Sequence, residues 1–181
     1  MNPIVTAVSS SAEHSFSKQN QPFITLIEGV GVEGDAHAGK TIKHIYLLKK
    51  DPSRPNLRQV HLIQAELFDE LLAKGFTIEA GQLGENITTR GIDLLALPTG
   101  SRLSIGDSVV IELTALRNPC VQIDNFQKGL LKAMIHRGED GKVIRKSGVM
   151  GIVISGGKIM PEDTISVDLP VKPHQPLEYV W

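Results

Sequence analysis

Short apolar segments separated by turn residues constrain this fold more than any other feature of the sequence. A β-strand needs only four to eight alternating or continuously apolar residues, bounded by Gly, Pro or Asp turns. Segments of this kind recur along the chain at Ile4–Val8, Pro22–Val30, Leu57–Ile63, Ile87–Thr89, Leu94–Leu97, Arg102–Ile105, Ser108–Ala115, Gly148–Ser155 and Ile159–Val167. We expect the last two to pair around Gly156 and Gly157. A parallel α/β sheet would need a helix between most strands, and the spacing leaves no room for one. The sequence therefore predicts a mainly β, barrel-like fold with about two helices.

Two segments have helical periodicity. Leucine and phenylalanine recur at i, i+3 and i+4 over Gln64–Lys74, and Gly75 follows as a stop signal. A second helix is expected to begin at Asp124 or Asn125, either of which can cap it, and to run to about Ile135.

The length of 181 residues suits one domain over 1–181. We expect its core within about 27–167, a polar mobile loop at 9–21, a surface loop at 49–56, and a C-terminal tail at 170–181 along the surface. Aromatic residues make up only 4% of the chain, so aliphatic side chains must fill the core.

The charge pattern and hydropathy exclude two classes of partner. A net charge of -1 with interspersed signs gives no basic surface for nucleic acid. No segment approaches the roughly 20 apolar residues of a membrane span. A single cysteine and no recognisable export signal indicate the cytoplasm.

Asp35 and His37 stand two residues apart in the glycine-rich stretch GVGVEGDAHAGK. Both side chains can point to one side of an extended segment, where they could bind a metal, transfer a proton or bind a polar ligand. A turn in which Asp35 accepts hydrogen bonds from backbone amides explains the same residues.

Two further stretches allow either a binding or a structural interpretation. Arg58, at the start of RQVHLI, could clamp an anion with its planar guanidinium or could simply be solvated. The loop GQLGENITT offers glycine-freed amides and the side chains of Glu85, Asn86 and Thr88 around Gly84. It could hold an anionic or heterocyclic ligand, and a tight turn before a strand explains it equally well.

Cys120 is the only cysteine, so it cannot form an internal disulfide. It follows Arg117, Asn118 and Pro119, and the Arg117 guanidinium would favour a thiolate. The thiol could be a metal ligand, a nucleophile, a sulfur carrier or a small buried hydrophobe. The chain has no Cys-x-x-Cys or His-Glu-x-x-His zinc pattern and no Gly-x-Ser-x-Gly nucleophile motif.

Taken in order, GVEGDAHAGK, LRQVHLI, GQLGENITTRGIDLLALPTGSRLSIGD and LRNPC resemble the MOSC family, named for the C-terminal domain of molybdenum cofactor sulfurase. The resemblance covers about residues 27–167 and fits the stand-alone members. The segment at 40–57 is longer than in compact members of the family.

The resemblance implies a barrel-like fold and a cavity for molybdenum cofactor (molybdopterin). It implies that Cys120 ligates molybdenum or carries sulfur as a persulfide, and that Asp35 and His37 act in catalysis. It makes cofactor-binding candidates of Arg58, Gly84, Glu85, Asn86, Thr88, Arg117 and Asn118. The implied activity is reduction of N-hydroxylated compounds, with persulfide carriage or cofactor delivery as the alternative. The implied partners are the pterin cofactor and an external electron donor or a molybdoenzyme.

Overall fold

A computed structural model describes the chain except for residues 1, 44–48, 50, 139–140, 142 and 180–181. The described residues are mainly β, as the sequence predicts. The strands are β1 Ile4–Ser10, β2 Gln19–Gln21, β3 Ile24–Ile27, β4 Gly31–Val32, β5 Val60–Gln64, β6 Ile87–Arg90, β7 Arg102–Ile105, β8 Val109–Leu116, β9 Ile135–Arg137, β10 Val143–Arg145, β11 Val149–Ser155, β12 Gly157–Ile159 and β13 Ile165–Asp168. The helices are α2 Glu66–Ala73, α3 Gln122–Phe126 and α4 Leu130–Ala133, with a 3-10 turn η1 at Leu94–Ala96.

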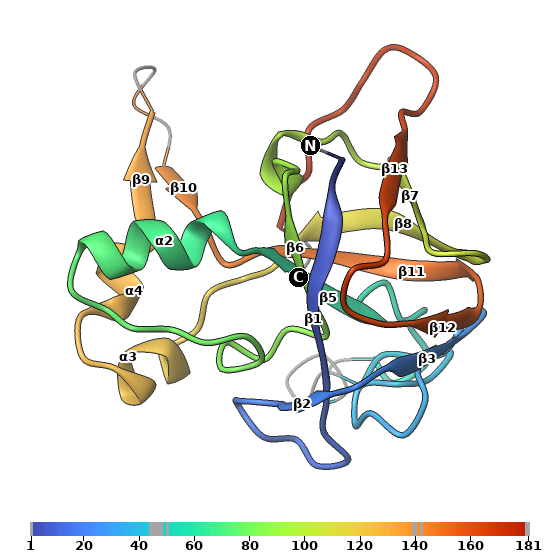
Figure 1. The fold of residues 1–181 in the computed structure, drawn as a ribbon, viewed down its shortest axis with the longest axis horizontal. Coiled ribbons are helices and arrows are strands. Elements are labelled where there is room, and N and C mark those ends of the chain that lie inside the picture. Colours follow the sequence, from blue (N-terminus) through green and yellow to red (C-terminus); the bar gives the residue numbers. More distant parts are fainter. Residues whose placement is uncertain (1, 44–48, 50, 139–140, 142, 180–181) are drawn as a thin grey trace.

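Eight strands form the main sheet in the order β13-β7-β8-β11-β5-β6-β1-β2. Every neighbouring pair is antiparallel except β5 and β6, which run parallel with α2 between them in the chain. A smaller sheet has the order β12-β3-β4, and β9 and β10 form a separate hairpin. Figure 1 shows the three helices and this hairpin on one side of the strands.

The main sheet curves so that β1 approaches the turn before β13. The amide of Val5 donates to the carbonyl of Asp163 at 2.9 Å, and Ile165 donates to Pro3 at 2.8 Å. Among the described residues this contact is an isolated bridge between Ile4 and Thr164 rather than a strand ladder. The mainly β prediction is confirmed, and closure into a barrel is not.

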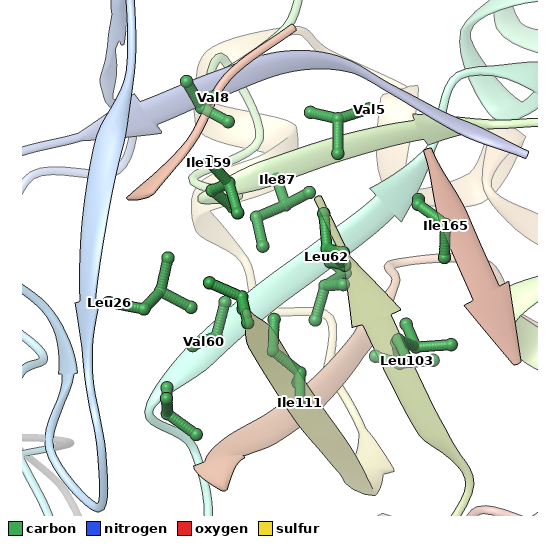
Figure 2. Packing of buried hydrophobic residues seen from close by; sticks show 14 of the residues in the cluster. Val5, Val8, Leu26, Val60, Leu62, Ile87, Leu103, Ile111, Ile159 and Ile165 are labelled. Carbon is green, nitrogen blue, oxygen red and sulfur yellow. The ribbon is translucent and has the colours of Figure 1, made fainter. Parts of the chain in front are cut away.

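Aliphatic side chains from every strand of the main sheet except β2, and from the smaller sheet, form the core (Figure 2). Alternation along β8 is strict, with Val109, Ile111 and Leu113 fully buried and the intervening residues half-buried. Burial of a side chain of this size contributes about 1.5–3 kcal/mol. β5 is buried on both faces, because Val60 and Leu62 pack into this core and Ile63 packs on the other side against the helices.

A second apolar cluster lies under the helices and joins them to β5 through Ile63. Leu67 and Leu71 of α2 are buried in it, whereas Leu72 is 61% exposed. Gly75, with φ +88°, ends the helix as expected.

Two predicted elements differ from the structure. Leu94–Leu97 is not a strand, because the Asp93 side chain accepts a hydrogen bond from the amide of Leu95 and closes the turn η1. The single helix predicted to run to Ile135 is broken into α3 and α4 by Gly129 at φ +87°. Asp124 does not cap it at the start; its carboxylate accepts from the amide of Leu131 across the break at 2.8 Å.

The prediction that Gly148–Ser155 and Ile159–Val167 pair with each other around Gly156 and Gly157 is also wrong. β11 pairs with β5 and β8, whereas β12 crosses to the smaller sheet and pairs with β3. A Cβ at Gly156 would lie 2.6 Å from the Leu26 carbonyl oxygen, so the chain passes too close to β3 for a larger residue there.

Parts of all three predicted surface segments are buried. Asn56, at the end of the predicted loop at 49–56, is 2% exposed. The stretch at 9–21 contains β2 and the buried Lys18, so it is not simply a mobile loop. The tail is exposed over 171–176, but Leu177 is only 6% exposed and packs into the main core. Residue 50 of the predicted loop at 49–56 is outside the described residues.

Candidate functional site

One cavity of about 140 Å³ collects most of the predicted site residues. It lies where the segment after β1, the glycine-rich turn, β5, the turn before β6 and the segment after β8 meet. Seven of the ten predicted residues line it, namely His37, Arg58, Gly84, Asn86, Arg117, Asn118 and Cys120.

The other three predicted residues are buried and do not line this cavity. Asp35 is 7% exposed, Glu85 is fully buried and Thr88 is 1% exposed. Each is bonded to the cavity wall or to its supporting turn, as described below. Residues that the motifs did not single out complete the lining: Ser15, Phe16, Lys18, Lys43, Asn56, His61, Gln122 and Met150.

Asp35 is the centre of a polar network beneath the cavity. Its Oδ2 lies 2.6 Å from the ammonium of Lys18 and accepts from the side chain of Asn86 at 3.0 Å. Its Oδ1 accepts from the amide of His37 at 2.9 Å and lies 3.2 Å from the His37 ring Nδ1. Burial alone would raise the pKa of Asp35, but the His37 hydrogen bonds and the Lys18 charge outweigh it and hold that pKa well below 3.8. The carboxylate is therefore ionised and fixes the orientation of His37.

Lys18 is the cationic partner in this network, with only 4% of its side chain exposed. Burial lowers the pKa of Lys18 from its ordinary value of 10.5, and the Asp35 carboxylate offsets part of that effect. The side chain lines the cavity, so its charge is available to a ligand as well as to Asp35.

Two asparagines fix the cavity wall by bonding to main-chain groups. Asn56 donates to the carbonyls of His37 at 3.0 Å and Gly39 at 2.9 Å, and accepts from the amide of Arg58. Asn86 accepts from the amide of His61 at 3.2 Å while donating to Asp35. These bonds fix the positions of Arg58 and His61 relative to the glycine-rich turn.

Arg58 and Arg117 place two guanidinium groups on the same cavity. Burial, with repulsion from Arg117, lowers the pKa of Arg58 to about 10. Burial also lowers the pKa of Arg117, and the charges of Cys120 and Glu85 raise it in part. Arg117 Nη1 is buried and has no hydrogen-bond partner among the described residues. A buried guanidinium donor without a hydrogen-bond partner among the described residues, on a cavity shared with a second guanidinium, indicates a site for an anion.

His61 lines the cavity in its neutral form. Burial lowers its pKa well below 6.5, and its Nε2 lies 2.8 Å from the carbonyl oxygen of Ser147, to which it donates. The sequence analysis did not select His61, because alternation along this strand predicts one buried and one exposed face. In the structure β5 is buried on both faces, and His61, three residues after Arg58, is therefore buried.

Glu85 supports the turn rather than the cavity surface. Its Oε1 accepts from the amide of Gly81 at 2.6 Å and from the Thr88 hydroxyl at 3.2 Å. Burial raises the pKa of this carboxyl group. Gly84 is required here, because it has φ +84° and a Cβ would lie 2.5 Å from the carbonyl oxygen of Phe16.

Cys120 is half-buried and lines the cavity, so the interpretation as sealed apolar filling is not supported. Its Sγ lies 3.4 Å from Oε1 of Gln122. The segment is anchored by Arg117, whose amide donates to the Gly148 carbonyl at 2.9 Å and whose carbonyl accepts from the Ser147 hydroxyl at 2.6 Å. A thiol, two guanidiniums and an oriented imidazole therefore share one cavity.

The family model of the MOSC domain matches residues 34–166, and the chain belongs to this family. It is similar to the YuaD protein from Bacillus subtilis, at 21% identity and a TM-score of 0.75 over 92% of this chain and 96% of that one. It is also similar to YiiM from Escherichia coli, at 18% identity and a TM-score of 0.60 over 95% and 73% of the two chains. These structures share the fold.

Among curated proteins, the chain is 27% identical over 156 residues to a protein of Gibberella moniliformis named "Reductase". The match covers 83% of this chain and 25% of that protein, so the chain spans about a quarter of its relative. No helix in the described part of the chain has the length and apolar character that a membrane span requires.

Proposed function

We propose that this protein binds molybdenum cofactor in the cavity beside Cys120 and reduces N-hydroxylated compounds. The observation that carries the proposal is the presence of the thiol of Cys120 and the cations of Arg58 and Arg117 on one cavity wall. We also propose a cytoplasmic location, where a single thiol stays reduced.

The residues present fit the chemistry of this cofactor. Its phosphate and pterin need cationic side chains and hydrogen-bond donors, and Arg117 Nη1 is a buried donor without a partner among the described residues. Arg58, Lys18 and the turn at Gly84 would complete the binding wall. Within the described residues no group of three or more His, Cys, Asp or Glu side chains could hold a metal ion. A metal bound by Cys120 would therefore take its other ligands from the cofactor, and soft thiolates suit molybdenum.

The bound cofactor would supply the electrons that cleave the N–O bond. Converting N–OH to N–H and water consumes two electrons and two protons. Asp35 fixes the His37 ring through Nδ1, which leaves Nε2 to hold a proton for the departing oxygen. The His37 side chain is 35% exposed, so it can exchange that proton with solvent. The His37 hydrogen bonds and the Lys18 charge keep Asp35 ionised, and the carboxylate therefore acts as the orienting group.

Membership of the MOSC family and the name of the fungal relative support this proposal. The alternative is a carrier in which Cys120 holds sulfur as a persulfide or passes cofactor to a molybdoenzyme. Arg117 favours this function as well, because a guanidinium on the same cavity would stabilise a persulfide anion.

Molybdenum content and turnover distinguish the two functions. The protein is produced in a host that makes the cofactor, and metal, intact mass and reduction of an N-hydroxylated base by reduced methyl viologen are measured. We expect molybdenum and turnover in the wild type, and loss of both in Cys120→Ala. A reductant-sensitive mass increase of one sulfur atom without bound molybdenum would favour the carrier. Equal metal and turnover in wild type and Cys120→Ala would refute both.

A second variant tests the proton-transfer role. His37→Gln is expected to retain molybdenum and to lose at least tenfold in kcat, with the pH dependence flattened. His174→Gln is the matched control, because His174 lies on the exposed tail, where its ring bonds to the Pro170 carbonyl. If His37→Gln keeps the wild-type kcat and pH profile, His37 has no part in proton transfer.

A further inference from the structure

The segment at 125–146 carries a charge opposite to that of the rest of the chain. It contains six Lys and Arg residues and two Asp and Glu residues, for a net charge of +4. The whole chain has a net charge of -1, so the remaining residues together carry -5. The electrostatic field of such an uneven charge distribution attracts a negatively charged partner to the basic segment.

The basic residues lie on elements that stand out from the strands. α3, α4 and the β9–β10 hairpin occupy one side of the molecule, with the hairpin projecting beyond α2 (Figure 1). Lys128, Lys132 and Arg137 are exposed, and no ion pair among the described residues includes any of them. Over the described residues of 125–146 there is no carboxylate side chain to neutralise them.

Large apolar side chains are exposed on the same elements. Ile135 is 37% exposed and Ile144 is 40% exposed, one on each strand of the hairpin. Arg145 is opposite Ile135 in the antiparallel register, so these two residues and Arg137 share one face of the hairpin, whereas Ile144 is opposite His136 on the other face. Apolar residues among unpaired cations are typical of a protein–protein interface and not of a surface that only binds phosphates.

Both ends of the segment that carries this surface are attached to the cavity that holds the thiol. Val121, which is 68% exposed, lies between Cys120 and Gln122, and both of these line the cavity. At the other end of the segment, Ser147 follows β10 and bonds to His61 and Arg117 of the cavity wall.

We propose that Lys128, Lys132, Arg137 and Arg145, together with Val121 and Ile135, form a docking surface for an acidic one-electron carrier protein of the flavodoxin or iron–sulfur type. We name this set the basic face. The inference rests on the proposed function, because reduction of one N–OH group consumes two electrons. Two carrier molecules would dock in turn, each losing one electron, while the two protons come from solvent. Complementary charge at the edge of the site brings the carrier close to the cavity.

The test uses an acidic flavodoxin and an acidic [2Fe–2S] ferredoxin as donors. Binding of each oxidised carrier is measured by titration calorimetry at low and high salt, and turnover is measured with each reduced carrier and separately with methyl viologen. The variants are Lys128→Glu, Lys132→Glu and Arg137→Glu, singly and combined. Lys172→Glu, a charge reversal at an exposed tail position, is the matched control.

We expect at least one carrier to bind in a salt-sensitive manner. Each single reversal should weaken binding several-fold and the triple variant at least tenfold, while methyl viologen turnover and the control stay at wild-type values. Wild-type protein that binds neither carrier at low salt, or a triple variant that binds as tightly as wild type, would overturn the proposal. Self-association or nucleic-acid binding lost in the triple variant, without carrier binding, would overturn it too. Absence of viologen turnover in the wild type would instead refute the proposed activity, and the binding measurement would stand on its own.

Discussion

Replacing Asp35 by Asn tests whether the buried network holds the cavity together. The substitution keeps the size of the side chain and removes its charge. Lys18 would then keep an ammonium group with 4% exposure and no carboxylate within 2.6 Å. The side-chain NH2 group of the new Asn, itself a donor, would also face other hydrogen-bond donors. Both Asp35 oxygens accept hydrogen bonds in the wild type, and the donors are Lys18, Asn86, Ser11 and His37.

The expected loss follows from burial of the pair. Breaking a buried ion pair from one side costs about 3–5 kcal/mol, since the remaining charge is left uncompensated. Lys18→Met should cost less, about 2–3 kcal/mol, because Asp35 keeps its hydrogen bonds from Asn86 and His37. The double variant carries neither charge and should lose less than the sum of the two single losses, by about 2 kcal/mol or more.

Urea unfolding followed by far-ultraviolet circular dichroism measures these free energies. A double-mutant cycle gives the coupling between the two side chains. Additive losses within about 0.5 kcal/mol would show that the pair has no net interaction. A loss below about 1 kcal/mol in Asp35→Asn would refute the argument that this carboxylate supports the fold.

The same network predicts a specific loss of stability in acid. The pKa of Asp35 is lower in the folded protein than its ordinary value of 3.8. A carboxylate shifted in this direction contributes stability above its unfolded pKa, and that contribution is lost as the pH falls through the folded value. The free energy of unfolding should therefore fall more steeply below about pH 4 in wild type than in Asp35→Asn.

Three further changes test particular positions. Gly148→Ala should destabilise the protein by at least 2 kcal/mol in urea unfolding, because φ is +89° and a Cβ would contact the Leu62 carbonyl. Gly75→Ala should cost only about 1 kcal/mol, because φ is similar at +88° but the space around a Cβ is open. Equal losses in these two variants would contradict the steric argument. Arg117→Met should weaken the stabilisation by inorganic phosphate in a thermal-shift titration at least tenfold in apparent Kd, and an unchanged Kd would exclude Arg117 from the anion site. Asp93→Ala should cost about 1 kcal/mol in urea unfolding by removing the bond to Leu95, and a loss within error would exclude a capping role.

Most strands could be predicted from the sequence because alternation and turn residues are local signals. β8 is the clearest case, since every second residue from Val109 is buried. Leu94–Leu97 could not be assigned in this way, because a short apolar run is compatible with a strand or a turn of helix. The Asp93 side chain decided between them through one local hydrogen bond.

The members of the site could be listed from the sequence more readily than their arrangement. Cys120 and Arg58 came from motifs, and both line the cavity. Lys18 was missed because a lysine in a polar stretch predicts exposure, and only Asp35, 17 residues away, explains its burial. Asn86 reaches Asp35 across 51 residues, a pairing that no local pattern contains.

The electrostatics of the cavity explain why its ligand should be anionic and should stabilise the protein. Burial, together with repulsion from Arg117, lowers the pKa of Arg58 to about 10. Lys18 is neutralised by Asp35, but the described structure provides no carboxylate bonded to Arg117 Nη1. Arg58 and Arg117 thus place two positive charges on the cavity beside Cys120, and Glu85 offsets the charge of Arg117 only in part. An anion that binds there removes the repulsion and satisfies the buried donor, and binding to the folded state alone raises the free energy of unfolding. Stabilisation by phosphate or molybdate should therefore exceed that by chloride at equal ionic strength, and equal effects would mean that the cations are only screened.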